Sequence, residues 1–259
     1  METTVSICKA AISKLKFARS SIFGYILSSA IAGVMIAFGS LLSMTAGGLC
    51  SSILGPAAKL VMSFSFAAAL SFIVAGGGEL FTGNNMVLGT GWFVRGISSS
   101  ACLSLWVLCW IGNLIGSWLA VLMFKAAGAI SVECVANTIA SVSAAKCSYS
   151  MTEMVVRGTL CNVLVCLAIW CSFRLKDETA KLVMVFWCIF AFMVCGFEHS
   201  IANMSIIGMA LVGDVQIDFG WIDYAKNLYF VTIGNVIGGV FLVSIPYSIA
   251  EYLRVQSSK

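Results

Sequence analysis

Six apolar runs divide the sequence, at roughly residues 21–47, 58–90, 100–127, 152–173, 181–212 and 227–252. A helix that crosses a bilayer core about 30 Å thick needs about 20 apolar residues. Each run meets that length, only 10% of the residues are charged, and the mean hydropathy is +1.01. The sequence therefore predicts an all-α integral membrane protein with six transmembrane helices.

The basic residues predict how these helices are oriented. With the N-terminus inside, ten bases fall on the inner side, namely Lys9, Lys14, Lys16, Arg19, Arg95, Arg174, Lys176, Lys181, Arg254 and Lys259. Five fall outside, namely Lys59, Lys125, Lys146, Arg157 and Lys226. Because cytoplasmic loops carry the excess of Lys and Arg, both termini are expected in the cytoplasm. Residues 1–20 are expected to form an amphipathic helix along the inner membrane surface.

A Glu-x4-Asn motif relates the second run to the fifth. It occurs at Glu79 and Asn84 and again at Glu198 and Asn203, 119 residues apart. A second match at nearly the same offset would indicate an internal repeat. The third and sixth runs supply that second match.

Ile-Gly-Asn-x-Ile-Gly stands at 111–116 and recurs at 233–238, 122 residues later. We therefore divide one channel domain, residues 1–259, into halves at about 21–127 and 152–252. Since each half has three helices, the second half must enter the membrane from the opposite side, as in the inverted repeats of many transporters.

Polar residues interrupt the second and fifth runs near their middle, at residues 76–84 and 196–203. At membrane depth, an interrupted helix is tolerated only where it lines a cavity or is buried in protein. Each new helix N-terminus carries a partial positive charge that favours an anion. We expect the two breaks to meet near the midplane as a pore for a small, negatively charged solute. The alternative is a pair of glycine kinks that serve only helix packing.

Composition argues against several other functions. The net charge of +4 does not indicate a nucleic-acid partner, because the bases are dispersed and no groove-reading module is present. His199 is the only histidine and no Cys-x-x-Cys pair occurs, so neither a metal site nor a cofactor is expected. An enzyme would need a nucleophile–base pair or a two-histidine metal site, and we expect none. Most of the eleven cysteines lie within apolar runs, whereas Cys50, Cys134 and Cys147 fall in predicted loops.

The segments that support this reading also resemble a known family. GELFTGN at 78–84 and GFEHSIANM at 196–204 are similar to the two signature segments of the formate/nitrite transporter family. CNVLVCLAIW at 161–170 and TIGNVIGG at 232–239 resemble its other typical stretches. The likeness covers essentially the whole chain and is greatest to the hydrosulfide channel branch of anaerobic bacteria.

This resemblance implies an aquaporin-like fold in a bacterial inner membrane. It implies a homopentamer with one pore in each protomer, embedded in the lipid bilayer. It also implies passage of small monovalent weak-acid anions, with hydrosulfide first and formate or nitrite as alternatives. Two further readings stay open: proton-coupled transport through His199, and an aquaporin-like pore for a neutral solute, although paired Asn-Pro-Ala boxes are missing.

The resemblance also assigns roles to individual residues. The pore centre comprises His199 and Thr82. The constrictions comprise Phe66, Leu70, Leu80, Phe81 and Phe192. Anion attraction or pore lining falls to Lys146, Asn162, Val165 and Asn235.

Physical chemistry leaves alternatives for some of these residues. His199 can bind a passing anion or lend it a proton, or it can be a buried neutral ring bonded to a backbone carbonyl. The Thr82 hydroxyl can face the lumen, cap the second half-helix, or do both. Glu79 and Glu198 are expected to accept hydrogen bonds from loop amides as scaffolding, together with Asn84 and Asn203, because a bare carboxylate would repel an anion.

Overall fold

The computed structural model describes residues 2–257, and all its regular elements over that range are helical. Met1, Ser258 and Lys259 lie outside the described residues. Met1 is the first residue of the expected N-terminal helix, and Lys259 is one of the bases expected on the inner side. The helices are α1 (Glu2–Ser20), α2 (Ile22–Leu54), η1 (Gly55–Ala57), α3 (Ala58–Phe66), α4 (Ala68–Gly76), α5 (Phe81–Phe93), α6 (Ser99–Ala126), α7 (Glu133–Ser148), α8 (Met151–Arg174), α9 (Glu178–Val194), α10 (Ser200–Val212), α11 (Trp221–Ile237), the π-helical η2 (Gly238–Ser244) and α12 (Ile245–Gln256).

Each apolar run of the sequence coincides with helix. The first, third and fourth runs are the single helices α2, α6 and α8, and the second and fifth runs are broken, as expected. Within residues 2–257, four helical stretches are long and apolar enough to cross a membrane: Ile22–Gly76, which comprises α2, η1, α3 and α4, then Ser99–Ala126, Met151–Arg174 and Trp221–Gln256. The predicted loop position of three cysteines is wrong, because Cys134 and Cys147 lie in α7 and Cys50 lies in α2.

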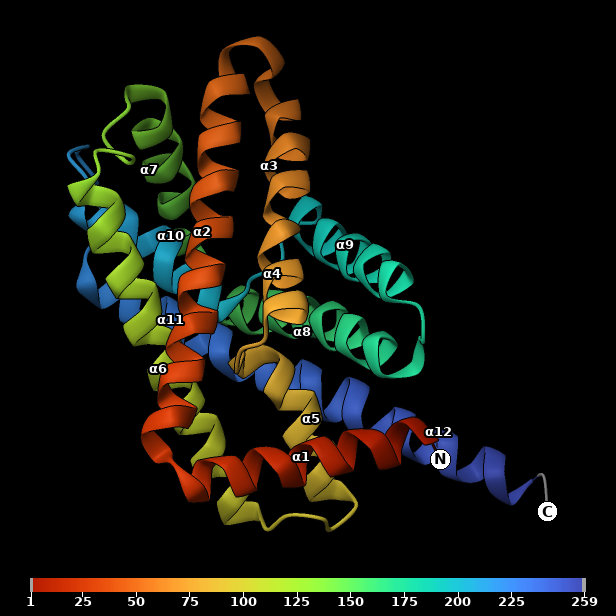
Figure 1. Ribbon diagram of the computed structural model, residues 1–259. Helices are drawn as coiled ribbons and strands as arrows, with labels where there is room; N and C mark the ends of the chain where they lie inside the picture. The colour runs from red at the N-terminus through yellow and green to blue at the C-terminus, as the bar shows by residue number, and fades with distance from the viewer. Residues whose placement is uncertain (1, 258–259) are drawn as a thin grey trace.

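Figure 1 shows α2 and α3–α4 side by side as an antiparallel pair, with α8 and α9 forming another. Helix α1 lies across one end of the molecule, whereas α7 and the turn between α2 and α3 lie at the opposite end. The amides of Thr3 and Thr4 donate to the Glu251 carboxylate at 3.2 and 2.8 Å, which fastens α1 to α12. The first and last helices therefore lie together at one end.

Glycines bring two pairs of helices close enough for backbone contact. A Cβ atom at Gly116 of α6 would lie 1.9 Å from the Ala30 carbonyl oxygen of α2. A Cβ atom at Gly238 would lie 2.2 Å from the Thr159 carbonyl oxygen of α8. Only glycine fits at these positions. Such close helix packing is what small residues at four-residue spacing predict in membrane helices.

The two breaks occur where the polar motifs predict them. Between α4 and α5 the chain is non-helical over four residues, and Gly77 has φ +80°. Between α9 and α10 the chain is non-helical again, and Gly196 has φ +72°. Because glycine adopts this left-handed region without a steric penalty, it permits the sharp turn at the start of each break.

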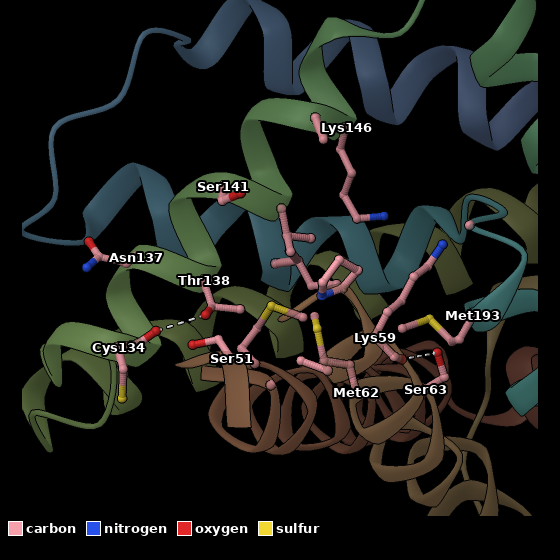
Figure 2. Close-up of a pocket in the computed structure, with 18 of the residues that line it drawn as sticks. Ser51, Lys59, Met62, Ser63, Cys134, Asn137, Thr138, Ser141, Lys146 and Met193 are labelled. Carbon is pink, nitrogen blue, oxygen red and sulfur yellow. Dashed lines mark hydrogen bonds between the residues drawn. The ribbon is translucent and has the colours of Figure 1, made fainter. Parts of the chain in front are cut away.

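A cavity of about 710 Å³ opens at the α7 end, between α2, α3, α7 and the loop at 195–199 (Figure 2). We call this cavity the vestibule. Its lining includes Lys59, Lys146, Phe197 and Glu198, so it reaches the residue next to His199.

Candidate functional site

The two breaks meet through one side-chain contact. Thr82 Oγ1 lies 2.9 Å from His199 Nε2, and both residues are buried. The backbone amide of Ala202 donates to His199 Nδ1 at 3.1 Å, so His199 caps α10. A neutral ring that accepts at Nδ1 carries its proton on Nε2. The ring therefore donates to Thr82, and the Thr82 hydroxyl hydrogen is left for another acceptor.

The ring nitrogens of His199 bond to the Ala202 amide and to Thr82, not to a backbone carbonyl as one alternative had it. An imidazole with its proton on Nε2 cannot accept the Thr82 proton, so the contact is no nucleophile–base pair. Thr82 does not cap its own half-helix, because the N-cap position of α5 is Leu80 and has no side-chain cap. The alternative in which Thr82 caps its half-helix is therefore wrong, and the side chain that caps a half-helix is His199, at the start of α10.

Asn113 of α6 holds the start of α5. Its Oδ1 accepts from the Phe81 amide at 2.9 Å. Its Nδ2 donates to the carbonyl oxygens of Glu79 at 2.8 Å and Ser29 at 2.7 Å. The side chain thus satisfies backbone groups that the break frees from helical bonding.

Asn235 of α11 does the same for α10. Its Oδ1 accepts from the Ser200 amide at 2.9 Å, and its Nδ2 donates to the carbonyl oxygens of Glu198 at 3.0 Å and Gly158 at 2.8 Å. Asn235, expected beside the pore, therefore has its amide engaged in supporting a break. Sequence reasoning missed Asn113, although the repeated Ile-Gly-Asn pattern marks it as the counterpart of Asn235.

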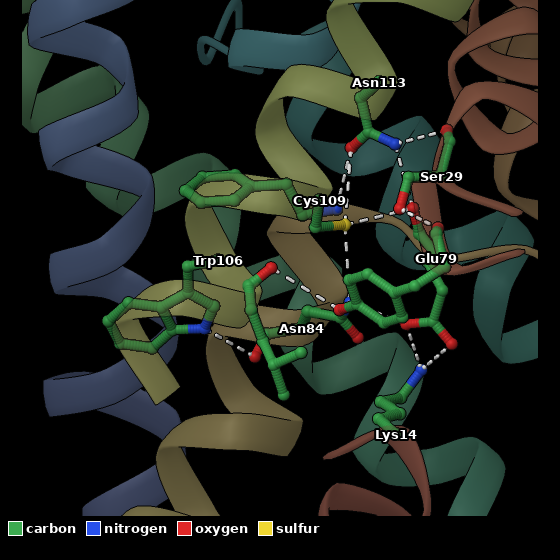
Figure 3. A network of polar contacts seen from close by, with 10 residues as sticks. Lys14, Ser29, Glu79, Asn84, Trp106, Cys109 and Asn113 are labelled. Atoms are coloured by element: carbon green, nitrogen blue, oxygen red, sulfur yellow. Dashed lines mark hydrogen bonds and ion pairs between the residues drawn. The ribbon is translucent and has the colours of Figure 1, made fainter. Parts of the chain in front are cut away.

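The Glu79 carboxylate is held by two side chains (Figure 3). Lys14 Nζ, from the surface helix α1, lies 2.7 and 2.6 Å from its two oxygens. Asn84 Nδ2 donates to it at 2.8 Å. Sequence reasoning missed Lys14, since nothing in the sequence pairs two residues 65 positions apart.

Glu198 in the second break has matching partners. It accepts from Lys146 Nζ of α7 at 2.9 Å and from Asn203 Nδ2 at 2.6 Å. Both carboxylates are therefore bonded, as expected, but the donors in each case are lysine and asparagine side chains rather than loop amides. The charge of Lys146, expected to attract anions, is paired with Glu198.

Asn162 of α8 links α5 with α11, the helix whose Asn235 supports the second break. Its Nδ2 lies 3.2 Å from the Thr82 carbonyl oxygen, 2.6 Å from the Asn235 carbonyl oxygen and 3.0 Å from Asn85 Oδ1. Asn162 Oδ1 and Asn85 Nδ2 are buried without a hydrogen-bond partner among residues 2–257. Buried polar atoms are normally paired, so these two are available to a small polar solute.

Aromatic rings lie beside the histidine. The Phe192 ring stacks on the His199 ring with centroids 6.0 Å apart and planes 14° apart. Phe66 meets Phe192 edge to face, again with centroids 6.0 Å apart. Two of the expected constriction residues therefore form an apolar boundary on one side of the polar contact.

The other expected residues are buried but less closely grouped. Leu70 lies on α4 and Val165 on α8, both in the hydrophobic core. Leu80 ends the first break, two residues before Thr82 in the sequence. Phe81 borders an apolar groove between α6 and α11.

A family model supplies the decisive comparison, because the model named "Formate/nitrite transporter" matches residues 1–249. The chain belongs to the formate/nitrite transporter family. This family consists of transporters and channels rather than enzymes.

Several relatives match over most of their length. "Nitrite transporter NirC" of Salmonella typhimurium is 34% identical over 247 residues, which is 94% of this chain and 90% of the relative. "Probable formate transporter" of Methanothermobacter thermautotrophicus is 34% identical over 263 residues, covering 94% of each.

Two solved structures match the fold. The "FNT family ion channel" has a TM-score of 0.88 at 32% identity and covers 96% of this chain and 98% of its own. The "Pentameric formate channel with formate bound" has a TM-score of 0.79 at 24% identity, over 91% of this chain and 99% of its own.

Proposed function

We propose that the chain is a membrane channel that passes small monovalent weak-acid anions through a pore in each protomer. The observation that carries this proposal is the contact between Thr82 and His199 at the starts of α5 and α10. Two helix N-termini and a free hydroxyl hydrogen attract a negative charge without adding a fixed ion that would trap it. Phe66 and Phe192 make the anion shed water before it reaches these donors.

The architecture we propose for this pore is six transmembrane helices in an aquaporin-like inverted 3+3 repeat, as one channel domain over residues 1–259. The matching bonds of Asn113 and Asn235 at the two breaks support the repeat. The likeness to a pentameric formate channel supports a homopentamer.

The proposed location is the bacterial inner membrane, with both termini in the cytoplasm. Helix α1 buries Ile7 and Ala11 and exposes Lys9, Lys16 and Arg19. An exposed basic face suits the anionic inner leaflet. The contact of α1 with α12 keeps the two ends of the chain on one side.

The physiological solute is proposed at the level of class. The relatives described above are named for nitrite and formate, whereas hydrosulfide rests on the resemblance of the sequence alone. All three are small weak-acid anions. Selectivity among them depends on pore dimensions finer than any motif encodes, so hydrosulfide, formate and nitrite must be compared directly.

The test is flux into proteoliposomes that hold the purified protein, with hydrosulfide, formate, nitrite and chloride. Wild type is compared with His199→Ala and Thr82→Ala. Flux of weak-acid anions that either substitution alters supports the proposal, and the anion with the largest flux identifies the solute. Passage of water or glycerol without any anion would show a neutral pore instead. Formate flux that requires an imposed proton gradient would show coupled transport.

A further inference from the structure

We propose that the apolar groove between α6 and α11 binds one acyl chain of a membrane phospholipid. This site is separate from the solute path, and it depends on the proposed function only for its membrane setting. The groove lies between two helical stretches that are each long and apolar enough to cross a membrane. A chain bound in it is therefore at the depth of the bilayer core.

Regularly spaced side chains form both walls of the groove, which has a volume of about 600 Å³. The α6 wall comprises Leu103, Trp106, Val107, Trp110, Leu114 and Trp118. These positions recur at three- and four-residue intervals, so they occupy one face of the helix. On α11 the lining follows one face in the same way, from Tyr224 to Val236. The groove is therefore a long slot that runs along both helices.

The dimensions of the slot fit one hydrocarbon chain. From Leu103 to Trp118 the α6 wall is about 22 Å long, at about 1.5 Å per residue. Spread over that length, 600 Å³ gives a mean cross-section of about 27 Å². A hydrocarbon chain has a cross-section of about 20 Å², because non-bonded carbon atoms pack about 4 Å apart. An α-helix with its side chains needs about 80 Å², so a helix of a second copy does not fit inside the groove.

The indole groups of the α6 wall give their N–H groups to the protein. Trp110 Nε1 donates to Thr232 Oγ1 at 3.1 Å. Trp106 Nε1 donates to the Asn84 carbonyl oxygen at 3.0 Å (Figure 3). None of the residues that line the groove within 2–257 is charged. The walls therefore complement an uncharged hydrocarbon chain and offer nothing to an anion or to a phosphate headgroup.

An aromatic cluster stands at one end of the groove. Trp118 Nε1 donates to the Tyr224 hydroxyl at 2.9 Å, and the Trp221 ring stacks on the Trp118 ring with centroids 5.4 Å apart. Trp221 begins α11 and is exposed. Because Trp and Tyr concentrate at the membrane–water interface, this end lies at the level of the headgroups. The polar part of the phospholipid belongs there, beyond the apolar walls.

The groove is open along its length to the exposed apolar surface of both helices. Leu103 and Val107 of α6 and Tyr229 of α11 line it and are themselves exposed. An acyl chain can thus enter sideways from the bilayer. Phe81 of α5 also lines the groove and directly precedes Thr82 in the sequence. The bound chain therefore contacts the residue next to the pore centre.

The experiment uses the full chain in vesicles of phosphatidylethanolamine and phosphatidylglycerol. The vesicles contain a phosphatidylethanolamine that carries a diazirine near the middle of one acyl chain, and mass spectrometry locates the residues labelled on irradiation. Leu114→Trp fills the groove from α6, and Ala225→Trp fills it from α11. Ile115→Trp is the matched control, because Ile115 is the exposed neighbour of Leu114 and lies outside the groove.

We expect wild type to be labelled on groove residues of both α6 and α11. Each filling variant should lower groove labelling about tenfold relative to labelling elsewhere on the protein, because losing contact with about two methylene groups weakens binding by that factor. Ile115→Trp should label like wild type. Labelling outside the groove shows that each variant is inserted in the bilayer.

Three results would overturn the site. The first is groove labelling that persists in both filling variants. The second is an unlabelled groove in wild type, which would leave a second copy of the chain as its occupant. The third is an equal fall in Ile115→Trp, which would show a general loss of lipid contact. None of these readouts requires anion flux, so a failure of the proposed pore would leave the lipid site standing.

Discussion

The Oγ1 atom of Thr82 lies 2.9 Å from Nε2 of His199, although 117 positions separate them in the sequence. The contact joins the first turn of α5 to the residue that caps α10. Because His199 Nδ1 is occupied by the Ala202 amide, the ring donates to Thr82 and orients the hydroxyl hydrogen away from itself. The Thr82 hydroxyl is therefore the donor that remains for a solute, and His199 in the second break determines the direction of its O–H bond.

Thr82→Val should separate the role of the hydroxyl from that of the side-chain volume. Loss of a hydrogen bond to an anion costs about 1.5 kcal/mol, which corresponds to about a tenfold fall in anion flux. Thr82→Ser keeps the hydroxyl and should stay within about twofold of wild type. Proteoliposome flux measures both variants. Equal flux in Thr82→Val and wild type would show that the Thr82 hydroxyl has no role in transport.

The tautomer of His199 can be tested directly because the chain has one histidine. In protein labelled with ¹⁵N-histidine, solid-state NMR should show Nε2 protonated and Nδ1 unprotonated at neutral pH. The reason is that the Ala202 amide already donates to Nδ1. A neutral ring with its proton on Nδ1 would contradict the cap and the direction of the bond to Thr82.

Three lysine–carboxylate pairs should rank in stability by their burial. The side chains of Lys146 and Glu198 are 13% and 2% exposed, those of Lys14 and Glu79 are 21% and 11% exposed, and the third pair, Lys125 with Asp214, is 47% and 66% exposed. Lys146→Gln leaves a buried carboxylate without its counter-ion and should cost about 3 kcal/mol.

Lys14→Gln should cost less than Lys146→Gln, at about 1–2 kcal/mol, because water screens the more exposed pair. Lys125→Gln is the matched control and should cost under about 0.5 kcal/mol. Thermal unfolding of the purified protein in detergent measures all three. An unfolding midpoint of Lys146→Gln no lower than that of Lys125→Gln would show that the ion pair does not stabilise its break.

Asn113→Leu should be among the most damaging single substitutions. It removes an acceptor for the Phe81 amide and two donors to backbone carbonyls, and each buried group left unpaired costs about 1–3 kcal/mol. Asn137→Leu is the control, since Asn137 is an exposed asparagine on α7. The yield of folded protein in the membrane and the unfolding midpoint should fall only for Asn113→Leu. Similar behaviour of the two variants would contradict the role of Asn113 at the break.

The sequence predicted the helical runs and the positions of both breaks, because these depend on local composition. Apolar length predicts a spanning helix, and a glycine beside polar residues within such a run predicts an interruption. The repeated Ile-Gly-Asn pattern also contained the information needed to find Asn113. The role of Asn113 was missed because the pattern was used only to define the two halves of the repeat.

Other features could not be read from the sequence because they depend on helices meeting in space. Lys14 reaches Glu79 from a surface helix, and Arg157 of α8 donates to the Gly196 carbonyl oxygen in the second break. The alternative that placed the N-cap of α5 at Thr82, rather than at Leu80, was wrong for a related reason. The amide of Asn113 takes the place of a local side-chain cap, and no local sequence pattern records a partner from another helix.

Cysteine labelling tests the proposed orientation. Cys195 is exposed at the end of α9, on the vestibule side, whereas Cys147 of α7 is buried. Burial raises the pKa of the Cys147 thiol to about 11, so at pH 7.5 only a small fraction is the reactive thiolate. A membrane-impermeant maleimide added to intact spheroplasts should therefore label wild type more than Cys195→Ser, while Cys147→Ser should label like wild type. If Cys195 reacts only after the membrane is permeabilised, the vestibule faces the cytoplasm and the orientation inferred from the basic residues is reversed.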